Sequence, residues 1–344
     1  MQKTALMTKT TIETKTDYAK IIKENERLLL AADSNIAYNL KMADHTTFKI
    51  GGPMDAFIEA HSPEGLLKAL SGARKLNVPC FLLGGGSNLL VSDNGIPGIV
   101  IKNKYKNISL LDQQGVSYML PELSPSDNAD SAFLFIGSGT KLADLVTYSC
   151  ENGLTGCEFL AGIPGTIGGA VYGNAGAYGK GIGDITVFAK LINSSNSIFT
   201  VDRNYFNFSY RTSKLKATGE TLVSVVVKLS KGDRAKVTAE VNKIIAERHQ
   251  KHPPETIGCA GSFFKNVSPL NPKSRKIAAG YFLEIAGAKE MKCGGAEVYS
   301  KHANFIINPG NAKASEVRQL ATALKSKVLE RFGILLEEEV LFIG

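Results

Sequence analysis

Two glycine-rich segments are the part of the sequence best suited to hold a phosphate-containing ligand. The first reads Gly84-Gly85-Gly86-Ser87-Asn88, and the second runs from Gly162 to Ala170 with Thr166 in its middle. A pyrophosphate needs several backbone N–H donors at close range, and glycine lets the chain approach closely in successive left-handed conformations. One such segment alone would more often be a tight turn. Two of them, each embedded in apolar sequence, predict a dinucleotide site.

The better-known nucleotide motifs do not account for these segments. Neither is followed by the Gly-Lys-Ser/Thr of a Walker loop. Ile136-Gly-Ser-Gly139 lies between an expected strand and an expected helix, as a Rossmann fingerprint does. Leu142 stands where its third glycine would be, which disfavours that motif.

The elements around the first segment place it at the end of a strand. Ser62, Pro63 and Glu64 are typical of a helix start, and the helix is expected to run to residue 77. Apolar strands are expected over residues 80–83 and 89–91, on either side of the glycines. Ligands commonly bind where a strand ends in such an α/β unit.

The remaining pattern suggests an α+β protein with several parts. An amphipathic helix is expected over residues 17–32, and strands dominate 186–229. The composition then changes to a helix over 233–249, a helix capped by Ser315, and a last strand over 334–343. We therefore predict an N-terminal extension (1–34), a ligand-binding domain (35–230, with lobes of about 35–100 and 101–230) and a C-terminal domain (231–344).

Composition limits the possible partners. The net charge of +8 suits anionic ligands, while no basic run or Arg-aromatic cluster favours nucleic acid. No apolar run approaches the length of a membrane span, and the first residues lack the apolar stretch of a signal peptide. The five cysteines have no metal-ligand spacing, so we expect reduced thiols, no metal site and a cytoplasmic location.

Longer motifs resemble one enzyme family. Leu82 to Val91, Glu158 to Val171 and Asn174-Ala-Gly-Ala-Tyr-Gly179 closely resemble the UDP-N-acetylenolpyruvoylglucosamine reductase (MurB) family. The resemblance covers about nine-tenths of the chain, from near Asn39 to Gly344. It implies the two-lobed FAD-binding fold shared with p-cresol methylhydroxylase and vanillyl-alcohol oxidase, followed by an α+β substrate-binding domain.

The resemblance also implies a reaction. NADPH would reduce non-covalently bound FAD, which would then reduce the enolpyruvyl group of the UDP-sugar to give UDP-N-acetylmuramate for peptidoglycan synthesis. The family's active-site arginine, proton-donating serine and glutamate fall on Arg211, Ser262 and Glu339. The expected FAD contacts are Gly84, Gly85, Gly86, Ser87, Asn88, Gly162, Thr166, Gly168, Gly169 and Gly176.

Substrate contacts are expected from four further residues. By family position these include Tyr178 and Asn266. Lys251 matches a family lysine if a one-residue gap is allowed, and His302 is a further candidate. The segment between Arg211 and residue 222 is short, which suggests the subtype without a substrate-covering tyrosine loop. The alternative function is a flavin oxidase of the same fold acting on an alcohol or phenol. Many such oxidases hold FAD covalently through His or Cys, and no such residue stands at a familiar attachment position here.

Overall fold

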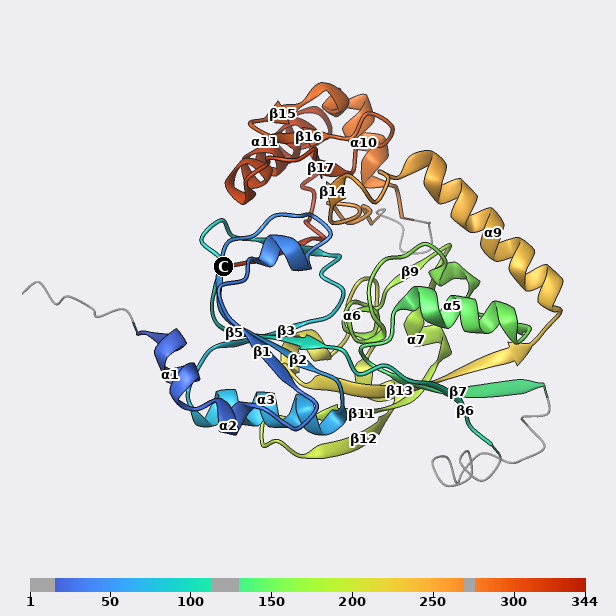
Figure 1. Ribbon diagram of the computed structural model, residues 1–344. Coiled ribbons are helices and arrows are strands. Elements are labelled where there is room, and N and C mark those ends of the chain that lie inside the picture. The colour runs from blue at the N-terminus through green and yellow to red at the C-terminus, as the bar shows by residue number, and fades with distance from the viewer. Residues whose placement is uncertain (1–15, 113–129, 269–275) are drawn as a thin grey trace, which may run out of the picture.

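The computed structural model of the protein describes residues 16–112, 130–268 and 276–344. These residues form two lobes side by side and a C-terminal α+β unit above them (Figure 1). The long helix α9 (Arg234–Lys251) runs along the second lobe and leads into the C-terminal unit. No helix among the described residues is both long and apolar enough to cross a membrane.

The first lobe is built on a four-stranded sheet. Its order is β1 (Asn35–Ala37), β2 (Met54–Ala60), β5 (Ile96–Asn103) and β3 (Cys80–Leu83), with β2 and β3 both parallel to β5. Helix α3 (Pro63–Lys75) packs on this sheet. The Ser62 hydroxyl accepts a hydrogen bond from the N–H of Gly65 at 3.0 Å, which confirms the predicted helix start.

The N-terminal segment is two short helices, not the single helix that the sequence favoured. They are α1 (Tyr18–Glu24) and α2 (Glu26–Leu29), and Asn25 interrupts them. Ile22 and Leu29 are fully buried in the core of the first lobe. A Cβ on Gly72 of α3 would lie 2.4 Å from the carbonyl oxygen of Leu28, so α2 touches α3 backbone to backbone. Residues 18–29, which belong to the predicted N-terminal extension (1–34), therefore pack against the first lobe; residues 1–15 of that extension lie outside the described residues, and its boundary stays a prediction.

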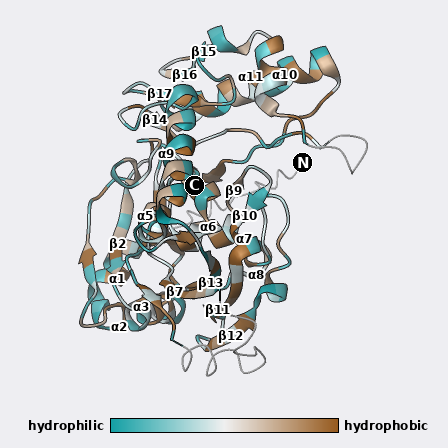
Figure 2. Cartoon of the chain, turned by 90° about the vertical axis from the view of Figure 1, so that its right-hand side faces the viewer, coloured by the Kyte–Doolittle hydropathy of each residue, from teal (hydrophilic) through white to brown (hydrophobic). Residues whose placement is uncertain are grey.

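The second lobe carries a larger antiparallel sheet. Its strands, in order, are β12 (Ile198–Asp202), β11 (Thr186–Ile192), β13 (Thr221–Lys231), β7 (Ser131–Gly137) and β6 (Ile108–Leu110), and β8 (Leu154–Thr155) also pairs with β13. Hydrophobic residues mark β11 and β13 in Figure 2. Helices α5 (Leu142–Glu151) and α6 (Ile167–Gly173) contribute to the same core.

Helix α9 confirms the helix expected over 233–249, with small differences at its ends. The Asp233 carboxylate accepts from the N–H of Lys236 at 2.9 Å and so caps the helix. Val241 and Ile244 join the core of the second lobe. The domain boundary near residue 230 stays a prediction, but α9, which it assigns to the C-terminal domain, packs on the second lobe.

Short elements complete the two lobes. They are β4 (Leu89–Val91), β9 (Gly176–Ala177), β10 (Lys180–Gly181), α7 (Ile182–Ile185), α8 (Leu215–Thr218) and the 3-10 helices Met42–His45, Glu158–Leu160 and Arg203–Phe206.

The C-terminal unit packs two helices on a small antiparallel sheet. The sheet order is β14 (Gly258–Cys259), β17 (Ile306–Asn308), β16 (Ala296–Val298) and β15 (Lys292–Cys293), and the helices are α10 (Ala279–Ile285) and α11 (Ala314–Phe332), with a 3-10 turn at Ala288–Glu290. The predicted cap of α11 by Ser315 is wrong. Asp93 of the first lobe accepts from the N–H groups of Ala314, at 2.7 Å, and Ser315, at 3.1 Å. A cap from a distant segment leaves no local signal.

The last part of the chain returns to the first lobe. Only β18 (Leu341–Ile343) is a strand, so the prediction of a strand over 334–343 is wrong in extent. The segment before it makes a single bridge, between Glu338 and Phe264, and then crosses between the parts of the molecule. Strand β18 pairs in parallel with β4, directly after the first glycine segment. This crossing brings residue 339 beside the glycine-rich loops.

Candidate active site

The two glycine-rich segments meet each other in space. A Cβ on Gly85 would lie 2.6 Å from the Cα of Gly165, and one on Gly84 would lie 2.6 Å from Oγ1 of Thr166. A Cβ on Gly86 would lie 2.2 Å from the carbonyl oxygen of His45. Glycine is therefore required here by the packing of backbone on backbone, a reason that the sequence did not reveal.

The first loop has the donors that a pyrophosphate needs. The N–H groups of residues 85–88 have no hydrogen-bond partner among the described residues. Lys102 donates to the carbonyl oxygen of Gly84 at 2.5 Å and so ties the loop to β5. Burial, with help from Lys104, lowers the pKa of Lys102 to about 8. A cavity of about 400 Å³ lies beside the loop, lined in part by Gly85, Lys102 and Lys104.

The side chains expected to help this loop point elsewhere. The Ser87 hydroxyl donates to the carbonyl oxygen of Pro164 at 2.9 Å. The Asn88 side-chain amide donates to the carbonyl oxygen of Glu339 at 3.0 Å. The Ser87 hydroxyl and one N–H of the Asn88 amide are thus used within the protein, which leaves the second N–H of that amide and the two backbone N–H groups for a phosphate.

The second loop opens with a left-handed glycine and ends at the start of α6. Thr166 caps α6 through Oγ1, which accepts from the N–H of Gly169 at 3.5 Å. The N–H of Gly168 donates to the carbonyl oxygen of Ser138 at 2.8 Å and is not available to a ligand. Gly162, with φ +67°, accepts a hydrogen bond from Arg248. The N–H groups of Gly162, Gly165 and Thr166 have no partner among the described residues, so both loops offer unpaired donors.

Arg211 and Glu339 form an ion pair next to these loops. Nε of Arg211 lies 2.7 Å from Oε1 of Glu339, and Nη1 donates to the carbonyl oxygen of Gly176 at 3.1 Å. The Nε–H is buried and has no aligned hydrogen-bond acceptor among the described residues, so this contact is one of charge. A guanidinium held in this way retains donors for a ligand carboxylate.

Burial controls the protonation of Glu339. Its side chain is 16% exposed, and this burial raises the pKa of the carboxyl above its ordinary value. Arg211, Lys216 and Lys265 oppose the rise but do not cancel it. A carboxyl group of this kind can hold or share a proton at a higher pH than a solvated one.

Ser262 is placed beside the ion pair by backbone hydrogen bonds. Phe263 follows Ser262 in the chain, and its carbonyl oxygen accepts a hydrogen bond from the N–H of Glu339 at 2.8 Å. The Ser262 hydroxyl has no hydrogen-bond partner among the described residues. Before it, Gly261 has φ +78° and open space where a side chain would be. The structure thus brings the three predicted catalytic residues together from the second lobe and two segments of the C-terminal unit.

Among the described residues, no hydrogen bond or ion pair joins the four predicted substrate residues to Arg211, Ser262 or Glu339. Tyr178 sits between β9 and β10, is 61% exposed, and its hydroxyl lies 3.3 Å from Oε2 of Glu247. Asn266 is exposed, and its N–H donates to the hydroxyl of Tyr210, the neighbour of Arg211. Lys251 is exposed at the end of α9.

His302 is packed among side chains of the C-terminal unit. Its Nδ1 accepts from the N–H of Asn304 at 3.2 Å, and its ring lies 5.0 Å from that of Phe305. Burial lowers the pKa of His302. No described contact links it to Arg211, Ser262 or Glu339.

Sequence reasoning missed one arginine near the site. Arg248 of α9 donates through Nε to the carbonyl oxygen of Gly162 at 3.2 Å. Burial lowers its pKa, and the charge of Arg211 adds to that effect. Nothing in the sequence singled out Arg248, because a cation near the end of a polar helix is usually exposed. Its contact with the second loop depends on how α9 crosses that loop.

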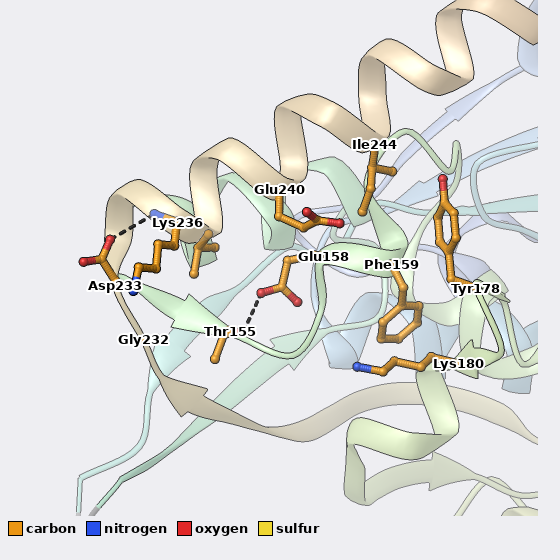
Figure 3. A pocket seen from close by; sticks show the side chains of 11 residues that line it. Thr155, Glu158, Phe159, Tyr178, Lys180, Gly232, Asp233, Lys236, Glu240 and Ile244 are labelled. Atoms are coloured by element: carbon orange, nitrogen blue, oxygen red, sulfur yellow. Dashed lines mark hydrogen bonds between the residues drawn. The ribbon is translucent and has the colours of Figure 1, made fainter.

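A second cavity, of about 450 Å³, lies under α9. Figure 3 shows Tyr178 and Phe159 toward one end of it and Asp233 and Lys236 toward the other. Neither the glycine loops nor the Arg211–Glu339 pair lines it. Among the described residues, no group of three His, Cys, Asp or Glu side chains is arranged to hold a metal ion.

Comparison with known proteins accounts for both halves of this site. A family profile described as an FAD binding domain matches residues 53–202, which include both glycine loops. The profile of the UDP-N-acetylenolpyruvoylglucosamine reductase C-terminal domain matches residues 252–343, which include Ser262 and Glu339. A UDP-N-acetylenolpyruvoylglucosamine reductase of Anoxybacillus flavithermus is 36% identical over 323 residues, covering 94% of this chain and 99% of that protein. The chain belongs to this reductase family.

Other members of the family agree. The enzyme of the same name from Desulforamulus reducens is 36% identical over 310 residues and covers 90% of this chain and 94% of that one. The crystal structure of the reductase (MurB) from Thermus caldophilus superposes with a TM-score of 0.70 at 27% identity, covering 90% of this chain and all of that one. The predicted family and the FAD-binding fold followed by a C-terminal domain are thus confirmed. The finer prediction of a shorter subtype stays a prediction.

Proposed function

We propose that the protein uses FAD and NADPH to reduce the enolpyruvyl group of UDP-N-acetylenolpyruvoylglucosamine, which yields UDP-N-acetylmuramate for peptidoglycan synthesis. The observation that carries this proposal is the cluster of Arg211, Ser262 and Glu339 beside the glycine loops. A carboxylate substrate needs a fixed cation, and a new C–H bond needs a proton donor. The cluster supplies both within one site.

The residues around the first glycine loop fit FAD. Four successive N–H groups without partners, at residues 85–88, form an anion site of the kind a pyrophosphate fills. Lys102 holds the loop and adds a nearby positive charge. Residues 85–88 and Lys102 would hold FAD, which would supply hydride transfer from NADPH to the methylene carbon of the substrate.

Arg211 is proposed to bind the substrate carboxylate. Hydride addition to the methylene carbon places negative charge on the adjacent carbon and on the carboxylate. A guanidinium is permanently charged and presents several donors in one plane, so it stabilises that charge as it grows. The contact of Arg211 with Gly176 fixes the plane of the guanidinium before the substrate arrives.

Ser262 is proposed to donate the proton that completes the reaction. A serine hydroxyl is a weak acid, so it donates only to a strongly basic, enolate-like carbon. Its hydroxyl has no competing partner among the described residues. Glu339 lies next to it in space, and its raised pKa allows it to share a proton or hydrogen bond with the intermediate.

The proposed partners are the UDP-sugar and NADPH. Tyr178, Asn266 and Lys251 remain proposed substrate contacts, with Arg248 added by its position against the second glycine loop. We propose a cytoplasmic location, where reduced cysteines of the kind predicted from the sequence persist.

An absorbance experiment tests this function. The purified protein should show the spectrum of bound oxidised flavin, and NADPH consumption should depend on the enolpyruvyl sugar nucleotide. A colourless protein that does not take up added FAD would contradict the proposal. NADPH consumption that is indifferent to the sugar nucleotide, or flavin reduction by an alcohol or phenol in place of NADPH, would also contradict it.

A further inference from the structure

The backbone at Arg211 has a conformation that long side chains rarely adopt. Its φ is +57°, in the left-handed region that favours glycine. It lies in a tight turn closed by two hydrogen bonds between Ser209 and Thr212. Contacts around the turn must therefore hold the conformation that aims the guanidinium.

Lys216 makes such a contact. Its Nζ donates to the carbonyl oxygen of Arg211 at 2.7 Å. Lys216 extends from α8, which is anchored because Leu215 is 1% exposed in the core. The Ser213 hydroxyl donates to the carbonyl oxygen of Tyr172 at 2.8 Å and fixes the start of the same segment. The ammonium of Lys216 thus reaches the left-handed turn from a segment that is itself held in place.

Lys216 also belongs to the charge cluster around Glu339. Partial burial lowers the pKa of Lys216, as do the charges of Lys265 and Arg211, while Glu339 opposes them. Lys265 is shared, because it also pairs with Glu337 at 3.0 Å. Positive charge is in excess around Glu339, which suits the arrival of a second carboxylate.

We propose that Lys216 is a positioning residue for substrate reduction: it holds the left-handed turn at Arg211 and so aims the guanidinium at the substrate carboxylate. This inference rests on the proposed function. It adds a residue that acts through Arg211 and does not touch the reacting atoms. Its loss therefore affects the step that uses the substrate and spares the step that uses NADPH.

The test compares Lys216→Met with Lys216→Arg in the full-length holoenzyme. Flavin absorbance, recorded without oxygen, follows flavin reduction by NADPH and flavin reoxidation by the sugar nucleotide separately. Lys216→Met should slow flavin reoxidation by the sugar nucleotide about tenfold or more, the size expected for one lost charge-assisted hydrogen bond. It should also raise the substrate concentration needed for half-maximal rate. Flavin reduction by NADPH should change less than about twofold, and Lys216→Arg, which can still donate to the carbonyl, should recover most of the loss.

The matched control is Lys214→Met. Lys214 is exposed on the same segment, and its ammonium lies 3.7 Å from the ring centre of Tyr205, away from the charge cluster. Equal behaviour of the two methionine variants would overturn the inference, as would equal losses in both half-reactions or an arginine variant no better than methionine. If Lys216→Met does not fold, Lys216→Gln, which keeps a donor without the charge, takes its place. Failure of the unaltered protein to use the sugar nucleotide would instead refute the proposed function.

Discussion

Replacement of Arg211 by lysine should separate the two half-reactions most clearly. The guanidinium makes two contacts at once, to Glu339 at 2.7 Å and to the carbonyl oxygen of Gly176 at 3.1 Å. A lysine ammonium is a single point of charge and cannot reproduce both. It keeps the positive charge, so the loss should be smaller than full removal of an oxyanion-stabilising donor.

The expected loss is about 2–3 kcal/mol of transition-state stabilisation, or about 30- to 150-fold in rate. The assay is anaerobic rapid mixing: flavin is first bleached by NADPH, and the return of its colour is then followed after addition of the sugar nucleotide. The loss should appear only in the second step. Folding should change little, because lysine and arginine bear the same strain at φ +57°.

The control is Arg234→Lys, an exposed position at the start of α9. Its two half-reactions should match those of the unaltered protein. The reasoning is refuted if Arg211→Lys retains flavin reoxidation within about twofold, or if NADPH oxidation slows equally, since the role assigned to the guanidinium concerns the substrate carboxylate alone.

Three further predictions concern the cofactor loop and the dependence of stability on pH. Lys102→Met removes the bond to Gly84 and should weaken FAD retention about tenfold, measured by flavin fluorescence on dilution. Gly86→Ala places a Cβ 2.2 Å from the carbonyl oxygen of His45 at φ +70° and should lower the free energy of unfolding by at least about 2 kcal/mol in urea. Burial and Arg248 lower the pKa of His252 to about 4, so between pH 6.5 and 4 the unfolded chain binds a proton that the folded chain does not. The free energy of unfolding should therefore fall by about 1–3 kcal/mol as the pH drops from 6.5 toward 4. His252→Gln should reduce that loss.

Each of these has a control or a contradicting result. Lys106→Met, an exposed neighbour, should leave FAD retention unchanged. Gly173→Ala, where an added Cβ meets nothing within 4 Å, should leave unfolding nearly unchanged. Equal effects of the paired variants would contradict the loop geometry. A pH profile unchanged by His252→Gln would remove that histidine as the cause.

The sequence predicted the elements that carry local signals. The cap at Ser62, the apolar runs at β3 and β4, and the periodicity of α9 each lie within one short segment, so a pattern could reveal them. The two glycine segments were predicted to hold one ligand, and the structure brings them into contact at Gly85 and Gly165.

The parts that escaped prediction depend on distant contacts. The carboxylate of Asp93 accepts from the N–H of Ala314 at the start of α11, and the side-chain amide of Asn88 donates to the carbonyl oxygen of Glu339. The left-handed backbone at Arg211 is accompanied by a side-chain contact from Lys216, which the residue types around Arg211 do not predict. Residue types alone did not select Arg211, Ser262 and Glu339; family resemblance did. In the structure Arg211 pairs with Glu339, whose backbone is bonded to Phe263, the residue after Ser262.

The measurement that tests the central claim most directly is reoxidation of pre-reduced flavin by the enolpyruvyl sugar nucleotide, without oxygen, in the unaltered protein and in Ser262→Ala. The account predicts that the colour of the flavin returns in the unaltered protein. In Ser262→Ala this return should be lost or greatly slowed, while bleaching by NADPH stays intact. No return of colour in the unaltered protein, or equal return in both, would contradict it.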